Sequence, residues 1–217
     1  MDIWALWLDA IRTVIMTSAD GGLGVGLAIV VVTLLLRTLL LPLAWPVAYR
    51  ACVRQRKMRE LQPELKALRD RFGDNPEAYL KKTKELYEKH GLALVDLKGV
   101  LGSLVQLPVF LGMFQALRDT GAGARFLWVS SLSRPDVLLA VIAGLTTAFM
   151  MSVNPDLPEQ VRLLMILLPS VIAIVAALQF SSALAIYWAT SNTFSALQTV
   201  ALHAVVRRRV RSGAIKP

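Results

Sequence analysis

Five apolar segments of about 20 residues constrain this chain more than any other feature of its sequence. They cover approximately residues 23–48, 100–117, 136–153, 161–178 and 182–204. A helix of about 20 apolar residues crosses the hydrocarbon core of a bilayer, and a soluble domain of this size does not carry several such runs. The pattern therefore predicts an all-α, polytopic membrane protein with a five-span helical core.

Two further segments have the character of membrane-interface structure. Within residues 2–17 the apolar positions recur with a helical period and include Trp4 and Trp7, which predicts an amphipathic helix lying in the interface. The polar connection between the second and third spans carries Phe126 and Trp128, and aromatic side chains of this kind favour the headgroup region. We expect both residues to act as interfacial anchors.

The basic residues lie in two groups that flank the apolar segments. Of the 24 Lys and Arg residues, 13 lie between Arg50 and Lys98 and five between Arg207 and Lys216. Cytoplasmic segments carry such an excess of positive charge, so both groups are expected in the cytoplasm, with the N-terminus outside and the C-terminus inside. A soluble nucleic-acid-binding protein would spread its basic residues over a folded polar surface, so no direct DNA binding is expected.

The charged segment after the first span predicts a helical hairpin. Its helices are expected at about residues 50–72 and 77–90, with Asn75 as the N-cap of the second and a kink at Pro63 in the first. The expected apolar seam between the helices consists of Leu61, Leu65 and Leu68 on one side and Leu80, Leu86 and Tyr87 on the other.

These segments give an expected domain organisation. It comprises an extracytoplasmic interfacial amphipathic helix (1–20), a first transmembrane span (21–49), a cytoplasmic basic helical hairpin (50–98), transmembrane spans two to five (99–204) and a basic cytoplasmic tail (205–217). No organelle transit peptide is evident, so the expected location is a bacterial inner membrane.

Arg37 is the residue of the first span that most strongly indicates function. A cation near the centre of a span costs about 2.5–3.5 kcal/mol on insertion scales, so it usually faces protein or a watery cavity. No other span offers a carboxylate to neutralise it. A hydrated groove would explain Arg37, while snorkelling of its side chain toward the cytoplasm is the open alternative. The polar residues of later spans that could share such a groove are Gln106, Thr190, Ser191, Asn192, Ser195 and Gln198.

Signals of enzymatic chemistry are weak. The chain has no dinucleotide-binding or Walker-type phosphate loop, and its single cysteine, Cys52, excludes an internal disulfide and the usual zinc quartets. Cys52 lies among charged residues, where we expect no structural role. Ser103 and His203 could in principle form the dyad of an intramembrane protease, but Ser103 lacks the glycine-flanked setting of such enzymes. We therefore expect no enzyme, no cofactor and no metal site.

Five local motifs in their order resemble the YidC/Oxa insertase family over nearly the whole chain. They are RTLLLPL at 37–43, KMRELQP at 57–63, ELYEKHG at 85–91, LVQLPVF at 104–110 and IYWATSN at 186–192, with Gln198 downstream. The chain looks like a short form without the large extracytoplasmic domain of many members. It departs from the usual pattern after Gly91 and between the last two spans, where Phe180-Ser-Ser-Ala183 stands.

The resemblance implies an energy-independent membrane protein insertase and chaperone. Arg37 would lie in a hydrophilic groove and attract acidic residues of a client segment, whose apolar helix would slide into lipid along the second and fifth spans. The residues implied for this slide are Phe110, Phe114, Phe180, Tyr187 and Trp188. The implied partners are nascent membrane proteins, the lipid bilayer and, through the hairpin and tail, the ribosome and the Sec translocon.

A small anion or solute transporter that uses Arg37 as its anion site is the alternative function. Transporters of this kind are usually built from internal repeats with broken helices in corresponding halves. No such repeat is visible in the sequence. Transport activity in liposomes would distinguish the two functions.

Overall fold

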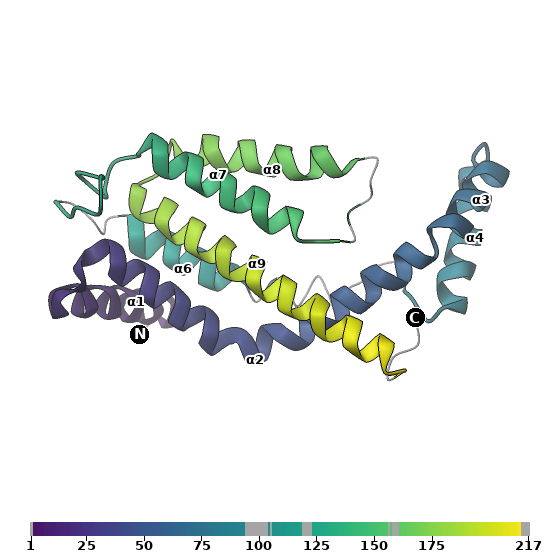
Figure 1. Ribbon diagram of the computed structural model, residues 1–217, viewed down its shortest axis with the longest axis horizontal. Helices are drawn as coiled ribbons and strands as arrows, with labels where there is room; N and C mark the ends of the chain where they lie inside the picture. The colour runs from purple at the N-terminus through teal and green to yellow at the C-terminus, as the bar shows by residue number, and fades with distance from the viewer. Residues whose placement is uncertain are drawn as a thin grey trace. The chain divides into compact units, whose positions relative to one another are not determined.

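The computed structural model describes residues 2–93, 104, 106–118, 123–155, 157 and 161–213, and the regular structure in these ranges is helical (Figure 1). The chain divides into two compact units. Unit 1 comprises residues 1–43 and 105–201, and unit 2 comprises residues 44–104 and 202–217. The long helices α2 (Gly24–Glu60) and α9 (Ser182–Arg211) each contribute residues to both units.

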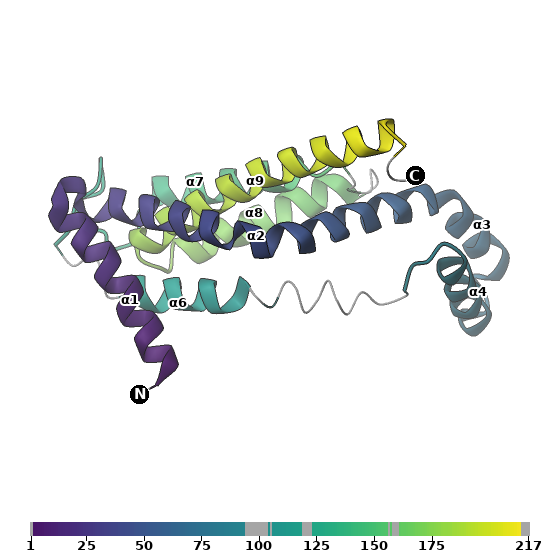
Figure 2. The same cartoon turned by 90° about the horizontal axis from the view of Figure 1, so that it is seen from below.

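Unit 1 begins with the amphipathic helix α1 (Ile3–Ser18), as the sequence predicts. The carboxylate of Asp2 caps it by accepting a hydrogen bond of 3.0 Å from the backbone N–H of Trp4. A π-helical turn, η1 (Ala19–Leu23), connects α1 to α2. Figure 2 shows α1 crossing α6 (Gln106–Arg118), and Gly112 allows this close approach because a Cβ there would lie 2.4 Å from Nε1 of Trp7.

The helices α7 (Val137–Ser152) and α8 (Arg162–Ala177) form an antiparallel pair in unit 1 (Figure 1). Most of the residues that these two helices bury are small: besides Leu139, α7 buries Ala140, Ala143, Gly144 and Thr147, and α8 buries Ser170, Ala173 and Ala177. Small residues let helix backbones approach closely, which is the usual basis of helix association in membranes. The rest of each surface carries large exposed apolar side chains.

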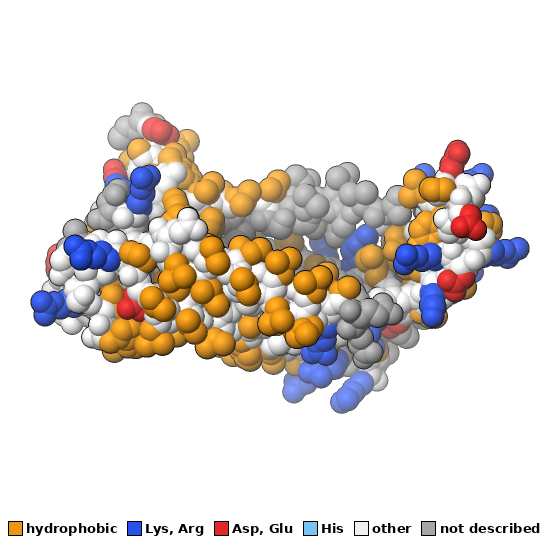
Figure 3. Space-filling view, turned by 90° about the horizontal axis from the view of Figure 1, so that it is seen from above, with side chains coloured by type: hydrophobic (Ala, Val, Ile, Leu, Met, Phe, Trp, Pro, Cys, Tyr) orange, Lys and Arg blue, Asp and Glu red, His pale blue; other side chains and the backbone are white. Residues whose placement is uncertain are grey.

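The exposed apolar side chains of α7 and α8 gather over one broad surface (Figure 3). Leu145 on α7 is 63% exposed, and Leu163 on α8 is 69% exposed. By length and composition, the helical run Ile3–Glu60 can cross a membrane, while Leu107–Arg118, Val137–Ser152 and Arg162–Ala177 are shorter apolar helices. The predicted first, third, fourth and fifth spans coincide with helices, but residues 94–103, where the second span is expected to start, lie outside the described part of the chain.

Unit 2 contains the helical hairpin of α3 (Gln62–Phe72) and α4 (Pro76–Lys89). The predicted single helix over 50–72 is wrong, because α2 continues to Glu60 and a break at Leu61 separates it from α3. Pro63 stands in the first turn of α3, where its missing N–H has no helical partner to lose. The proline thus starts a helix and does not kink one.

The hairpin packs around a small apolar core, most of which the sequence predicts. Leu61, Leu86, Tyr87 and Leu92 are buried, with Met58, Leu65 and Leu68 packed against them. Leu80 was expected in this seam, but it is 56% exposed. On the exposed side of α4, Lys82 donates a hydrogen bond of 2.7 Å to Glu85, which lowers the pKa of that carboxyl.

Asn75 caps α4 as predicted, since its side-chain oxygen accepts a hydrogen bond of 3.0 Å from the N–H of Ala78. Replacing Asn75 by alanine should destabilise the first turn of α4 by about 0.5–2 kcal/mol, the usual cost of losing an N-cap. Hydrogen exchange of the hairpin amides measures this, with Ser133→Ala, an exposed serine of unit 1, as a control. Unchanged exchange in the first turn of α4 would show that the cap contributes nothing.

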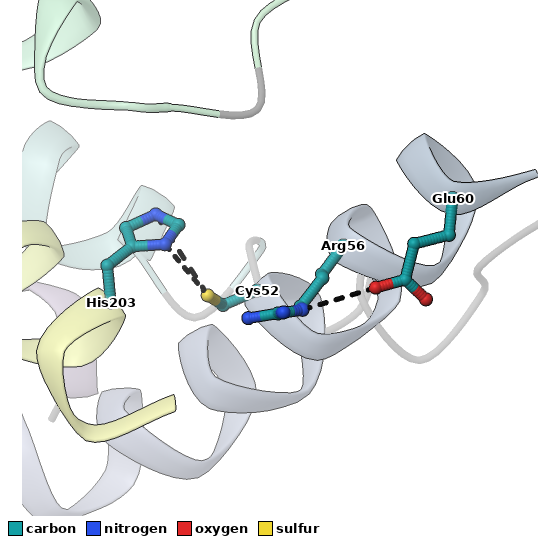
Figure 4. Close-up of polar contacts among 4 residues, drawn as sticks. All are labelled: Cys52, Arg56, Glu60 and His203. Atoms are coloured by element: carbon teal, nitrogen blue, oxygen red, sulfur yellow. Dashed lines mark hydrogen bonds and ion pairs between the residues drawn. The ribbon is translucent and has the colours of Figure 1, made fainter. Parts of the chain in front are cut away.

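The ends of α2 and α9 pack together within unit 2 around Cys52. Contrary to the sequence expectation, Cys52 is only 4% exposed, and Leu202 and Val206 of α9 are buried with it. Its sulfur lies 3.3 Å from Nδ1 of His203 (Figure 4). The cysteine therefore has a structural role, as a small apolar side chain between two helices.

Candidate functional site

Arg37 of α2 points toward α9 within unit 1 and meets a polar group there. Its Nη2 donates a hydrogen bond to the hydroxyl of Ser191, which is 4% exposed. Tyr187, one turn earlier on α9 and 2% exposed, lies close to both side chains. Of the polar residues predicted to share a groove with Arg37, the structure places Ser191 in contact with it. Tyr187 is a partner that the sequence analysis assigned to a different role.

The charge of Arg37 lacks an acidic counterpart among the described residues. Its Nε atom is buried and has no hydrogen-bond partner there. The ion pairs Arg56–Glu60, Lys82–Glu85 and Lys84–Glu88 lie in unit 2 and do not involve Arg37. A half-buried cation that retains an unsatisfied donor is costly unless something anionic or polar approaches it. The site is thus suited to attract a negatively charged group.

Asn192 connects α9 to α7 at a buried position. Its Nδ2 donates a hydrogen bond of 2.7 Å to the hydroxyl of Thr147, which in turn donates to the carbonyl of Ala143. Asn192 is 9% exposed and Thr147 is 5% exposed. Asn192 was a candidate for a polar groove from the sequence, and in the structure its side chain joins α9 to α7.

The structure describes the side chains of three further predicted groove residues on α9. Thr190 donates to the carbonyl of Ile186 in its own helix, and Ser195 and Gln198 are half-buried on α9. The side chain of Gln106 lies outside the described part of the structure. Of the predicted set, the structure therefore brings Ser191 to Arg37 and directs Asn192 to a different helix.

Several hydroxyl groups of unit 1 bond to the carbonyl four residues earlier in the same helix. The pairs are Thr33 with Ile29, Thr147 with Ala143, Ser170 with Ile166, Thr190 with Ile186, Thr193 with Ala189 and Thr199 with Ser195. Such bonds satisfy a polar side chain without a partner from another helix. The hydroxyls of these residues are thus satisfied within their own helices.

An aromatic cluster links α6 and α9 next to the arginine. The ring centroid of Phe110 lies 6.3 Å from that of Phe114 and 6.4 Å from that of Tyr187, while Phe114 and Phe180 meet edge to face at 5.3 Å. Phe110 and Phe180 are each 37% exposed, whereas Tyr187 is 2% exposed. Four of the five residues expected for the slide therefore lie in one cluster, with Tyr187 at its buried end. Trp188 is half-buried on α9.

We expect the Asn192–Thr147 hydrogen bond to stabilise unit 1 by about 0.6 kcal/mol, the average for such interhelical bonds in membranes. A double-mutant cycle with Asn192→Ala and Thr147→Val measures this coupling through reversible unfolding in detergent. The pair Thr193→Val and Thr146→Val serves as a control, because each of these hydroxyls bonds only within its own helix among the described residues. Additive effects for Asn192 and Thr147 would contradict the prediction.

Two other chemistries were considered from the sequence, a metal site and a Ser–His dyad. Within the described ranges, no three His, Cys, Asp or Glu residues gather in an arrangement suited to a metal ion. Ser103, one half of the hypothetical protease dyad, lies outside those ranges, and His203 contacts Cys52.

The chain is similar in sequence to the proteins of one family. A sequence model of the 60Kd inner membrane protein family matches residues 16–209. A Membrane protein insertase YidC from Oceanobacillus iheyensis is 33% identical over 196 residues, covering 83% of this chain and 75% of its own length. A Membrane protein insertase YidC 1 from Halalkalibacterium halodurans is 37% identical over 186 residues, covering 80% of this chain and 68% of its own.

The fold also has a relative among solved structures. A crystal structure of an active YidC insertase with its first transmembrane domain resolved superposes with a TM-score of 0.65. The match covers 92% of this chain and 47% of the other, at 23% sequence identity. The two proteins therefore share a helical membrane fold.

Proposed function

Because the chain belongs to the 60Kd inner membrane protein family, we propose that it is a membrane protein insertase and chaperone that moves client segments from the cytoplasm into the bilayer. Its relatives at 33% and 37% identity carry the name of insertases. The observation that carries the proposal is Arg37, which contacts Ser191 between two helices and has no carboxylate partner among the described residues. A client's acidic segment would supply that partner.

The proposed mechanism begins with the charge of Arg37. A polar client segment would enter a hydrophilic groove from the cytoplasm, where the cation lowers the cost of moving its acidic residues across the membrane. The groove would be lined by Arg37, Gln106, Thr190, Ser191, Asn192, Ser195 and Gln198. Asn192 would contribute by holding α9 to α7, since its side-chain amide is already bonded to Thr147.

The aromatic cluster would then guide the apolar part of the client. The partly exposed rings of Phe110 and Phe180 offer a contact surface, and Phe114 and Trp188 lie beside it. Tyr187 is buried and would not contact the client. It would position Arg37 and support the ring of Phe110. Transfer of the client helix into lipid is favourable by itself, so no nucleotide, cofactor or catalytic step is needed.

The proposed topology has five spans, with the N-terminus outside and the C-terminus in the cytoplasm of a bacterium. It follows the domain boundaries at residues 20, 49, 98 and 204, and it places the basic hairpin and tail on one side. The exposed arginines Arg207, Arg208 and Arg211 would then be available to the ribosome. The hairpin would contact the ribosome or the Sec translocon.

The experiment that tests this function uses the purified chain in liposomes. A radiolabelled single-span client with an acidic translocated tail is added, and protease protection of the tail measures insertion. Insertion above that of empty liposomes supports the proposal. Failure with this client and with a second acidic-tailed client would overturn it, and anion uptake by the same liposomes would then favour a transporter.

A further inference from the structure

The connection before α7 forms a small, well-bonded hairpin in unit 1. The N–H of Phe126 donates to the carbonyl of Val129 at 3.0 Å, and the N–H of Val129 donates back at 2.8 Å. The N–H of Leu132 closes the hairpin on the carbonyl of Ala124 at 2.9 Å. Leu127 and Trp128 occupy the tip between the bonded residues. We call residues 124–132 the tip hairpin.

The base of the tip hairpin is fixed to the bundle. Val129 and Leu132 are 4% and 0% exposed, and the N–H of Ala183 at the start of α9 donates to the carbonyl of Leu132 at 3.1 Å. The ring of Phe126 packs directly on Gly26 at the start of α2. The hairpin therefore lies at the end of unit 1 where α2, α7 and α9 begin (Figure 1).

The tip itself presents apolar side chains outward. Leu127 is 75% exposed and has a φ of 50°, a left-handed conformation that leucine rarely adopts. Trp128 is 48% exposed, and its Nε1 donates to Asp136, the N-cap residue of α7, at 3.2 Å. The indole is thus held in one orientation, and the backbone turns Leu127 away from the protein. Burial within the chain does not account for either side chain.

We propose that the tip hairpin is a lipid anchor that inserts Leu127 and Trp128 into the headgroup boundary of the bilayer. The bundle end to which it is bonded is an end of apolar helices, where a headgroup layer would lie. Tryptophan favours this layer because its ring is apolar while its N–H needs a polar partner, here Asp136. Exposed Arg125 and Arg134 flank the tip and complement the charge of lipid phosphates.

The anchor lies in the extracytoplasmic leaflet if the topology under the proposed function holds. It corrects the expectation from the sequence, because Phe126 packs inward on Gly26 and Leu127 takes its place at the surface. Anchoring at this position would fix the depth of the starts of α2 and α9. The site of Arg37 and Ser191 would then keep a constant depth in the membrane.

Depth measurement with a spin label tests the proposal. A nitroxide is placed on Leu127→Cys or, as the matched control, on Ser130→Cys, an exposed polar residue three positions away. Both are made in a Cys52→Ala background and reconstituted in vesicles of phosphatidylethanolamine and phosphatidylglycerol. For each label, the collision rate with oxygen is divided by the collision rate with a water-soluble nickel chelate. This ratio should be at least several-fold higher at position 127 than at position 130. Equal ratios at the two positions would overturn the proposal.

A second variant separates anchoring from folding. Leu127→Gly suits a φ of 50°, so thermal unfolding in detergent should be unchanged or slightly raised. In vesicles, brominated lipids should quench the fluorescence of Trp128 less in this variant than in the unmodified chain. The contribution of Trp128 is obtained by subtracting the signal of a Trp128→Phe variant. Unchanged quenching would contradict a role of Leu127 as anchor. Labelling of Ser130→Cys by a membrane-impermeant maleimide reports the leaflet separately, so a failed topology is distinguishable from a failed anchor.

Discussion

Replacing Arg37 by alanine is expected to reduce insertion of a client with an acidic translocated segment by about tenfold or more, which corresponds to about 1.4 kcal/mol. The guanidinium has a hydrogen bond to Ser191 and a buried Nε without a partner among the described residues, so its charge remains available to the client. Arg37→Lys keeps the charge and should retain most of the activity. Arg37→Gln removes the charge while keeping a hydrogen-bond donor, and should behave like alanine.

The measurement is protease protection of the client tail in liposomes, with equal amounts of each folded variant. A client whose tail carries no acidic residue serves as the control and should respond weakly to all three substitutions. Ser191→Ala should have a smaller effect than Arg37→Ala, because the cation remains. Normal insertion of the acidic client by Arg37→Ala would refute the charge-attraction mechanism, while the family assignment would stand.

Replacing Gly26 by valine is expected to lower the thermal stability of unit 1 by several degrees. A Cβ at this position would lie 2.2 Å from Cγ and 2.6 Å from Cβ of Phe126. The clash involves the Cβ and Cγ atoms of Phe126, which a change of side-chain rotamer displaces little. Because the backbone of Phe126 is also bonded to Val129, the ring cannot easily move away. Overpacking of this kind costs about 1–3 kcal/mol. The gain in helix propensity over glycine is below about 1 kcal/mol.

Gly21→Val provides a matched control, because a Cβ at Gly21 meets no atom within 4 Å. Thermal unfolding in detergent compares the two variants, and a Phe126→Ala substitution should restore much of the stability lost in Gly26→Val. Equal melting temperatures for the two valine variants would contradict this prediction. They would show that the tip hairpin shifts to accommodate the added side chain without loss of stability.

The sequence predicted helix positions well where hydropathy decides them and less well at prolines. The apolar periods placed α1, α7 and α8 close to their observed bounds. Pro42 and Pro46 lie inside α2, which continues through both to Glu60. In a membrane span, neighbouring helices and local adjustments satisfy the backbone groups that a proline frees. A sequence pattern cannot show which prolines interrupt a helix and which are accommodated.

The candidate site was predictable only in part. The sequence shows a cation within an apolar run and names Ser191 among the polar residues that could lie near it, but it does not show which of these residues Arg37 contacts. The contact of Tyr187 with Arg37 was missed because an aromatic residue in a span usually indicates packing or lipid contact. Only the three-dimensional arrangement shows that Tyr187 lies beside Arg37.

Side-chain direction in loops and short helices was the least predictable feature. Phe126 and Leu127 are neighbours, and a positive φ at Leu127 determines which of them faces outward. Leu80 follows the apolar spacing of the hairpin but lies on the exposed side of α4. Cys52 lies among charged residues in the sequence, yet the facing surface of α9 buries it. Periodicity in the sequence does not show any of these three directions.

The hydroxyls that bond within their own helices have a consequence for how the bundle can change shape. Thr33, Thr190 and Thr199 would keep their hydrogen bonds if their helices moved apart, because each acceptor travels with its donor. Among the described residues of unit 1, the side-chain hydrogen bonds that separation of α9 from α2 and α7 would break are those of Arg37 with Ser191 and of Asn192 with Thr147. A polypeptide with polar groups of its own could replace both. Under the proposed function, a client segment could therefore enter unit 1 and leave it again without leaving polar side chains of the bundle unpaired.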